Sequence, residues 1–187
     1  KTSKLEIYGD GQTPSLSIPS DMIENKEKTI SCSSVIGNPE NAVKLGVKRP
    51  GENSFSIQSS GVSTVDSTTD EMREQCNYQK TVSFTQTFGS TWNLTDVGCF
   101  VSNGSSTFET SDSKTEDTII LVTENYCQGE SDYAKKYNPR GCSYYVQCFG
   151  EMPSSLPCGS GTCFSFDNDS PCYHCRSAPY PCNITST

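Results

Sequence analysis

Few residues of this chain have types and spacing that could support metal chemistry. The segment CYHC at 172–175 has the gap of a zinc ligand pair, and His174 is the only histidine. A zinc site usually needs a second Cys/His pair at matching spacing, and we see none. Asp167 and Asp169 could offer oxygens to calcium, but the rest of a calcium loop is missing. We therefore expect no metal and no cofactor.

The sequence does not predict an enzyme either. A single histidine leaves no Ser-His-Asp arrangement near an obvious serine motif. The segment GSG at 159–161 follows no strand-to-helix pattern, so it predicts a turn and not a phosphate loop. Paired carboxylates for glycoside hydrolysis need a deep cleft that small domains rarely form.

Composition places the chain in an oxidising compartment. The 187 residues predict one or two domains, and 32% hydrophobic residues with a mean hydropathy of -0.56 leave little core. Eleven cysteines indicate that disulfides replace the missing core. No apolar run could span a bilayer, and without an initiator Met we expect a processed, secreted form. The net charge of -8 argues against a nucleic-acid partner.

Four Asn-x-Ser/Thr sequons agree with secretion. We expect glycosylation at Asn93, Asn103 and Asn183. Asn168 is the poorest acceptor, because Pro171 follows its sequon and cysteines surround it.

The composition changes near residue 125. Residues 126–187 hold eight of the 11 cysteines and seven of the 9 tyrosines, whereas most of the net negative charge lies before them. We therefore predict two domains, residues 1–124 and 125–187.

The first segment reads as short alternating strands separated by turn signals. The stretches KTISCSSV, AVKLGVKRPGENSF, KTVSFTQTF, CFVS and TIILV predict strands, and only DEMREQC shows a weak helical pattern. Trp92 is expected to be an aromatic of the core or of the turn before CFVS. Many short strands with few helices predict an all-β sandwich.

One stretch of this segment is more specific. In LTDVGCFVS, the residues Leu94, Asp96, Gly98 and Phe100 resemble the signature before strand F of immunoglobulin domains, with Phe in place of Tyr. TISC resembles strand B of that fold, and Leu45 lies where the family usually has its core Trp. The resemblance covers residues 1–124 and implies an immunoglobulin-like sandwich.

The cysteines depart from that family's pattern. The strand F cysteine would fall at Ser102, whereas Cys99 lies three residues earlier. Strand alternation turns Cys99 away from the face of Phe100. Either a β-bulge re-aims Cys99 to meet Cys32, which we favour, or Cys99 pairs with Cys76.

The second segment carries a cysteine framework. Six of its eight cysteines are separated by 14, 5, 9, 13 and 9 residues. This spacing, with CSYYVQC and CGSGTCFSFDNDSPC, resembles the peritrophin-type (type 2, invertebrate) chitin-binding domain, although Gly159 replaces a family proline. The resemblance implies the pairs Cys127–Cys148, Cys142–Cys182 and Cys158–Cys172, and leaves Cys163–Cys175 as the fourth pair.

The tyrosine pair in CSYYVQC raises a question of orientation. Adjacent strand residues face opposite ways, so we expect one tyrosine in the core and one on the surface. The family resemblance puts Tyr145 in the core and leaves Tyr144 exposed.

The resemblance also implies a ligand. Chitin presents pyranose C–H faces that stack on aromatic rings, and acetamides that need hydrogen bonds. We predict the ligand-binding residues Tyr144, Phe164, Asp167, Asn168 and Tyr173.

Together these features predict a secreted, non-enzymatic recognition protein that binds chitin or another N-acetylglucosamine-containing glycan. The architecture resembles chitin-binding immune-type lectins of invertebrates and protochordates, in which the immunoglobulin part binds a protein or a microbial surface. Two alternatives remain: a structural matrix protein of cuticle, gut lining or shell, and a secreted ligand that uses the cysteine module as a scaffold.

An odd number of cysteines rules out a fully paired monomer. If Cys32 pairs with Cys99, Cys76 is left in the polar stretch EMREQCNYQK, where we expect it to be exposed. An exposed thiol in an oxidising compartment finds a partner, so we predict a disulfide-linked homodimer or a capped thiol.

Overall fold

The computed structural model describes residues 12–37, 41–102, 106–139, 143–164 and 172–174. The chain forms two compact units. The first, here called the sandwich unit, combines residues up to Ile18 with Lys28–Gln86 and Leu94–Ile119. The second, the cysteine-rich unit, combines residues from Ile120 onward with the segments Pro19–Glu27 and Thr87–Asn93. A single boundary between residues 124 and 125 stays a prediction.

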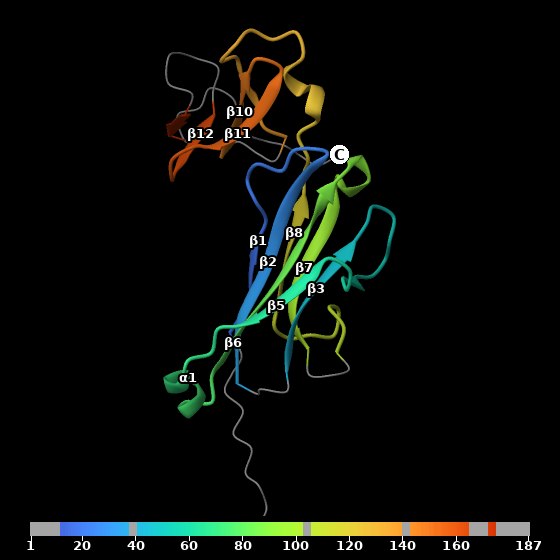
Figure 1. Ribbon diagram of the computed structural model, residues 1–187, viewed down its shortest axis with the longest axis vertical. Helices are drawn as coiled ribbons and strands as arrows, with labels where there is room; N and C mark the ends of the chain where they lie inside the picture. The colour runs from blue at the N-terminus through green and yellow to red at the C-terminus, as the bar shows by residue number, and fades with distance from the viewer. Residues whose placement is uncertain (1–11, 38–40, 103–105, 140–142, 165–171, 175–187) are drawn as a thin grey trace, which may run out of the picture. The chain divides into compact units, whose positions relative to one another are not determined.

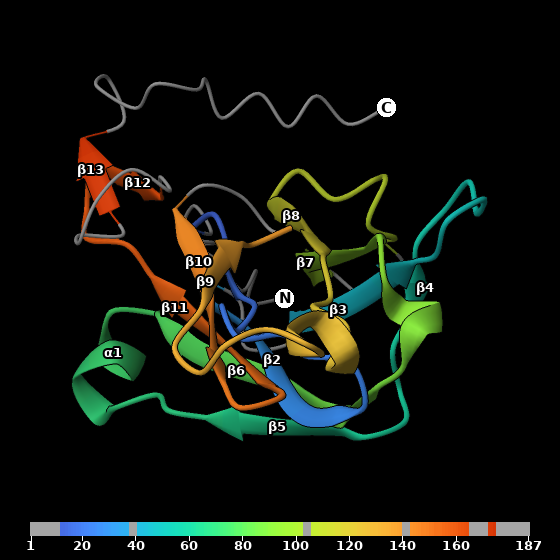
Figure 2. The ribbon, with the colours of Figure 1, turned by 90° about the horizontal axis from the view of Figure 1, so that it is seen from above.

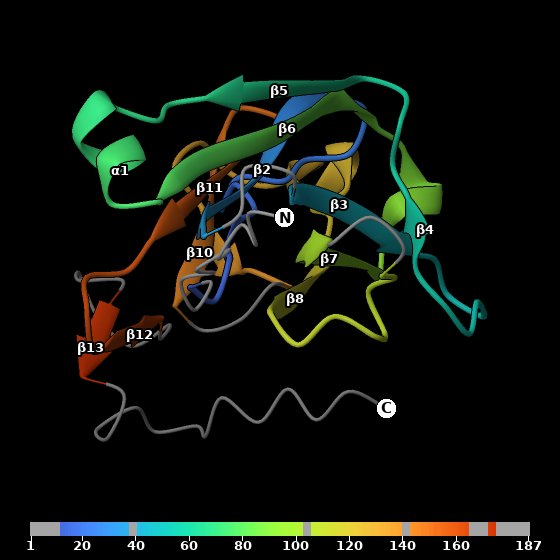
Figure 3. The ribbon, with the colours of Figure 1, turned by 90° about the horizontal axis from the view of Figure 1, so that it is seen from below.

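The sandwich unit consists of two four-stranded antiparallel sheets, seen end-on as two layers in Figure 3. One sheet has the order β1-β2-β6-β5 and the other β4-β3-β7-β8. This is the A-B-E-D and C′-C-F-G arrangement of an immunoglobulin-like sandwich, so the predicted fold class is confirmed. The strands, labelled in Figure 1, are β1 (Ser15–Ser17), β2 (Lys26–Ile36), β3 (Ala42–Lys48), β4 (Ser56–Ile57), β5 (Val62–Asp66), β6 (Tyr78–Phe88), β7 (Thr95–Ser102) and β8 (Lys114–Ile119).

The sandwich core follows strand alternation. Every second residue of β2 from Ile30 to Ile36 is buried, as are Val82 and Phe84 of β6. Leu45, at the position of the family's core Trp, is 1% exposed and lies opposite Cys99 in the β3–β7 register. Alternating apolar residues thus place the buried side of each sheet against the other.

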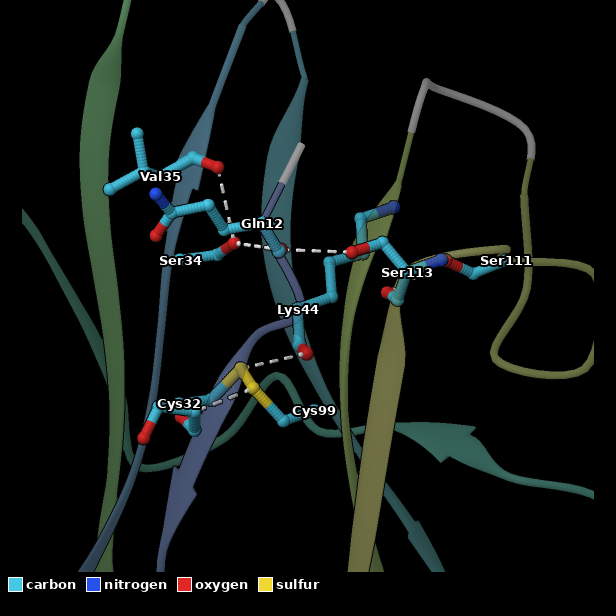
Figure 4. Close-up of a disulfide and its surroundings, with 9 residues drawn as sticks. Gln12, Cys32, Ser34, Val35, Lys44, Cys99, Ser111 and Ser113 are labelled. Atoms are coloured by element: carbon cyan, nitrogen blue, oxygen red, sulfur yellow. Dashed lines mark hydrogen bonds between the residues drawn. A yellow bond between two sulfur atoms is a disulfide. The ribbon is translucent and has the colours of Figure 1, made fainter. Parts of the chain in front are cut away.

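Cys99 reaches Cys32 without the expected bulge. Residues of β3 and β7 pair one against one from Ala42↔Ser102 to Lys48↔Asp96. Thr95, Val97 and Cys99 alternate toward the core, and the disulfide to Cys32 has a Cα–Cα distance of 5.4 Å (Figure 4). The bulge prediction is therefore wrong. β7 alternates regularly, but its inward side carries Cys99, whereas the signature residues Gly98 and Phe100 are on its other side.

Gly98 and Phe100 therefore lie on the outer face of the β4-β3-β7-β8 sheet, where other aromatic rings cover them. Phe100 is fully buried and meets the ring of Phe108 edge-on at 5.8 Å. Phe108 in turn lies 4.0 Å from Phe55, centroid to centroid. Phe108 occupies the space over Gly98, where an added β-carbon would come within 2.5 Å of the ring.

Polar contacts of the N-terminal segment link the two sheets at one edge of the sandwich. The backbone oxygen of Gln12 accepts hydrogen bonds from the hydroxyls of Ser34 and Ser113, both at 3.0 Å (Figure 4). Ser34 belongs to β2 and Ser113 precedes β8, so one carbonyl links the two sheets. Cys32 Sγ lies 3.4 Å from the backbone oxygen of Lys44, a polar contact made by a sulfur that carries no hydrogen.

The weak helical pattern forms a single short helix, α1 (Asp70–Glu74), between β5 and β6. The hydroxyl of Thr69 caps it by accepting a hydrogen bond from the Met72 N–H at 3.2 Å. The strand predicted at 118–122 is displaced: β8 begins four residues earlier, at Lys114, and ends three residues earlier, at Ile119.

The cysteine-rich unit is built around a three-stranded antiparallel sheet, β11-β10-β9, whose strands lie side by side in Figure 2. Its core contains Val122, Cys127, Val146 and Cys148, and the last three are fully buried. Its elements are η1 (Ser90–Trp92), η2 (Glu124–Cys127), β9 (Lys135–Tyr137), β10 (Tyr144–Phe149), β11 (Met152–Pro157), β12 (Thr162–Phe164) and β13 (Cys172–His174).

Candidate functional site

The central strand β10 separates two faces of the sheet. Val146 and Cys148 are fully buried on one side, and alternation places Tyr144 with them. Tyr145, Gln147 and Phe149 point to the other side. We call this second side the outward face; its positions, from the strand register, are Lys135, Tyr137, Tyr145, Gln147, Phe149, Met152, Ser154 and Leu156.

The expected roles of the two tyrosines are not what the structure shows. Neither ring is exposed: both Tyr144 and Tyr145 are partly buried. Tyr144 shares its side with Val146 and Cys148, whereas Tyr145 lies on the outward face. The family pattern indicates which of the two tyrosine positions the family shares. Alternation along β10, counted from the buried Cys148, decides which tyrosine faces the core.

The first aromatic group lies at one end of the outward face and consists of Tyr137, Tyr145 and Phe164. The rings of Tyr145 and Phe164 are stacked, with centroids 5.6 Å apart and planes 12° from parallel. Tyr137 meets Phe164 edge-on at 5.2 Å and is itself 41% exposed. Phe164 is only 2% exposed, so the two tyrosine rings pack against a buried ring at this end of the sheet.

The second aromatic group lies at the β10–β11 turn and consists of Tyr133, Phe149 and Met152. Tyr133 and Phe149 meet edge-on at 5.6 Å, and Met152 pairs with Phe149 across the hairpin. Their exposed fractions are 61%, 41% and 71% for Tyr133, Phe149 and Met152. Exposed apolar side chains gathered in this way commonly mark an interaction site.

The backbone around the second group is held in an unusual conformation. Tyr133 has a φ of 65°, in the left-handed region that a bulky residue rarely adopts. Its N–H donates a 2.7 Å hydrogen bond to the backbone oxygen of Cys148. Asp132 fixes the neighbouring turn by accepting a 2.8 Å hydrogen bond from the Gly150 N–H. Such strain, of about 1–3 kcal/mol, persists only where the surroundings impose it, and it is common at functional sites.

Polar residues separate the two aromatic groups. Gln147 pairs with Lys135 on β9 and with Ser154 on β11, so these three side chains form a row across the sheet. All three are partly buried. The outward face therefore alternates aromatic, polar and aromatic positions along the strands.

The other side of the sheet is anchored by hydrogen bonds. Asn138, 2% exposed, donates from Nδ2 to the Ser155 hydroxyl at 2.6 Å, which donates to the Ser20 backbone oxygen at 2.7 Å. Lys136 Nζ donates to the Tyr126 backbone oxygen at 2.7 Å and pairs with Glu130 at 3.0 Å. These contacts fix the sheet that carries the aromatic groups.

A shallow hollow of about 280 Å³ lies in the same unit. It is lined by four residues with polar side chains, Glu124, Asn125, Gln128 and Glu151. Glu151 belongs to the β10–β11 turn, between Phe149 and Met152. Through Glu151, the hollow offers a hydrogen-bonding group that is adjacent in sequence to the second aromatic group.

The predicted ligand residues have different locations. Phe164 is buried, so its ring is not available to a ligand in this structure. Tyr144 faces the buried side, and the backbone of Tyr173 lies on β13 opposite Cys163. Asp167 and Asn168 lie outside the described residues. Sequence reasoning missed Tyr133, Tyr137, Phe149 and Met152, although alternation in YYVQCF could have predicted that Tyr145 and Phe149 share a face.

The structure pairs Cys32 with Cys99, Cys127 with Cys148 and Cys158 with Cys172. Cys163 is also disulfide-bonded. Among the described residues, Cys76 is the free cysteine, and it is exposed. The predicted partners Cys142, Cys175 and Cys182 lie outside the part of the chain that the structure describes.

Of the predicted glycosylation sites, only Asn93 can be located. It is exposed at the end of η1, and its Oδ1 accepts a 2.9 Å hydrogen bond from the Leu121 N–H. Its Nδ2, the atom that a glycan would modify, is not used in that bond. Asn103 and Asn183 are outside the described residues.

Within the described ranges, no group of three or more His, Cys, Asp or Glu side chains could hold a metal ion. The helices in those ranges are also too short to cross a membrane.

Fold and site together define a protein with an immunoglobulin-like sandwich and a disulfide-rich β unit. Two solved structures are similar to it, Rst D1-D2 and the full ectodomain (Ig1-Ig3) of mouse nectin-like molecule 4. They are 12% and 11% identical, with TM-scores of 0.43 and 0.40, and the matches cover 62% and 80% of this chain. The chain spans about half the length of each, 50% and 55%. No protein-family model matches the chain, and no curated protein matches it.

Proposed function

We propose that this chain is a secreted, non-enzymatic recognition protein whose cysteine-rich unit binds chitin or a related N-acetylglucosamine polymer through its outward face. The sandwich unit would bind a second partner, a protein or a microbial surface. The observation that carries the proposal is the set of exposed aromatic and apolar side chains on a sheet that needs few of them for its core.

The chemistry of the outward face suits a neutral polysaccharide. Aromatic rings offer flat apolar surfaces to the C–H faces of pyranose rings. Gln147 and Ser154 offer both donors and acceptors to hydroxyl and acetamide groups, and no metal is needed. The cysteine spacing supports the same ligand class, by resemblance to the peritrophin type.

The disulfides support an extracellular location, because such bonds persist in oxidising compartments. A covalent homodimer through Cys76 would present two outward faces to one polymer. Two linked sites can bind far more tightly than one.

Retention on chitin beads tests the proposal. The full oxidised chain should be retained on chitin and washed off cellulose under the same conditions. Tyr137→Ala should weaken retention, because Tyr137 is the more exposed tyrosine of the first aromatic group. Val65→Ala is the matched control, since Val65 is 54% exposed but lies on β5 of the sandwich unit.

Equal elution from both matrices would contradict the proposal. Tyr144→Ala tests the original site prediction separately. Loss of retention with unchanged thermal stability would show that Tyr144 contacts the ligand, whereas lost stability would assign it to the fold.

A further inference from the structure

We infer that the two aromatic groups are two subsites for one linear glycan, which runs along β10 and must contain at least three sugar units to reach both. This inference rests on the proposed function and adds the length and direction of the ligand. It also assigns a binding role to Tyr133, Phe149 and Met152.

The separation of the groups sets the minimum length. Tyr145 and Phe149 lie on one face of one strand, four residues apart, which corresponds to about 13 Å at the rise of an antiparallel strand. This distance exceeds the length of a disaccharide. A disaccharide can therefore stack on one group only, whereas a longer chain can stack on both.

The polar row fits the middle of such a ligand. Gln147 lies midway between Tyr145 and Phe149 on the same face. Its neighbours across the sheet are Lys135 and Ser154. A sugar between the two groups would meet hydrogen-bonding side chains at its edges, where its hydroxyls and acetamide lie.

Both groups are ordered before a ligand arrives. Tyr145 is held by its stack on the buried Phe164, and the ring of Tyr133 by its contact with Phe149. The left-handed backbone of Tyr133 sets the direction of that side chain. Rings already in place lose little conformational freedom on binding, so more of the contact free energy appears as affinity.

The charges of the outward face favour a neutral occupant over an acidic or basic protein. Its eight strand positions include one cation, Lys135, and no carboxylate. The exposed side chains are aromatic or apolar at both ends. This distribution suits an uncharged polymer with alternating apolar faces and polar edges.

Calorimetric titration of the full chain with N-acetylglucosamine oligomers of two to six units tests the inference. We expect the affinity to rise at least about tenfold between the disaccharide and the tetrasaccharide, because the second contact becomes intramolecular, and to level off for longer oligomers. Phe149→Ala should remove this rise and leave only the first aromatic group as a site for the disaccharide. Met152→Ala, at a 71% exposed position where refolding is not at risk, should reduce the rise. Val65→Ala should change neither.

Each result has a distinct meaning. Equal affinity for disaccharide and tetrasaccharide, or equal weakening of both by Phe149→Ala, overturns the two-subsite inference while the proposed function stands. No binding of any oligomer, together with no retention on chitin, overturns both. Retention of a protein partner that Phe149→Ala abolishes, with no oligomer bound, would assign the outward face to protein recognition and overturn both as well.

Discussion

The two units of this chain are stabilised in different ways. The sandwich unit buries a large set of apolar side chains between and upon its sheets, with one disulfide at its centre. The cysteine-rich unit has a core cluster of four residues, of which Cys127 and Cys148 are two. Beyond that cluster, the unit also buries the rings of Phe88, Trp92 and Phe164. Because its disulfides contribute part of its stability, other aromatic residues can lie on the surface, as Tyr133 and Phe149 do.

The disulfides also differ in the length of chain they close. Cys32 and Cys99 are 67 residues apart, whereas Cys127–Cys148 and Cys158–Cys172 close 21 and 14. In the chain-entropy description, the long loop corresponds to about 4 kcal/mol and each short loop to about 3 kcal/mol. The difference per bond is small, so the bond matters most where little else is buried.

The strongest test of this contrast removes the central bridge of the smaller core. In Cys127→Ala/Cys148→Ala, half of the core cluster is truncated and a bridge of about 3 kcal/mol is lost. We expect the cysteine-rich unit to lose its fixed structure while the sandwich unit keeps its own. Amide NMR spectra would show collapse of the signals of β9–β11 only. Retained dispersion there would show that the other contacts suffice.

Removal of the disulfide in the sandwich unit should have a milder effect on its structure. Cys32→Ala/Cys99→Ala should lower the free energy of unfolding by about 4 kcal/mol, yet leave a folded sandwich, because its other core residues, among them Leu45 and Phe84, remain buried. Urea denaturation followed through the amide NMR signals of β3 and β7 would measure the loss. Complete unfolding without denaturant would mean that this unit, too, depends on its bridge.

Packing itself can be tested at two glycines that lie opposite each other, Gly46 and Gly98. Gly98→Ala would place a β-carbon 2.5 Å from the Phe108 ring, and we expect a destabilisation of about 1–3 kcal/mol. Gly46→Ala is the control, since its β-carbon would lie 3.3 Å from Phe55. Thermal denaturation should rank the two variants in that order, and equal losses would show that the aromatic cover moves freely.

In the cysteine-rich unit, a substitution of Tyr133 should affect stability and glycan binding differently. Tyr133→Asn places a residue that tolerates the left-handed region where φ is 65°, so we expect stability to stay equal or to rise by about 1 kcal/mol. Tetrasaccharide affinity should fall, because the exposed ring is gone. A loss of stability equal to that of Phe149→Ala would indicate that Tyr133 serves packing alone.

The smallest effect on folding is expected at Cys76. Because this cysteine is exposed and free, Cys76→Ser should change the free energy of unfolding by no more than about 0.5 kcal/mol. It should nevertheless remove any dimer band on a non-reducing gel. A dimer that persists in Cys76→Ser would have to be non-covalent or use another cysteine.

Sequence reasoning predicted the sandwich well because alternation and turn signals are local properties. It placed β2, β3, β6 and β7 and gave Leu45 a core position. It failed where register relative to another element decides the outcome. The signature residues Gly98 and Phe100 lie outside the sandwich core because Cys99 faces inward to bond Cys32, and the sequence alone did not exclude a bulge there.

The candidate site shows the same limit. Cysteine spacing located the segment, but not which of Tyr144 and Tyr145 faces outward. Nor did it reveal that Tyr133, twelve residues before Tyr145, would lie against Phe149. Such proximity depends on a hairpin turn and on a left-handed residue, neither of which has a strong sequence signal here.

The hydrogen bond from Ser155 to the Ser20 backbone oxygen has a consequence for how this protein can be divided. Residues 19–27 belong to the cysteine-rich unit, and Ile23 pairs with Val122 in a parallel bridge. A piece cut at residue 125 would lack this strand-like support and would leave a buried hydroxyl without its acceptor. The cysteine framework is therefore not a module that can be transplanted by its cysteines alone, and a gene fusion would have to carry the earlier segment with it.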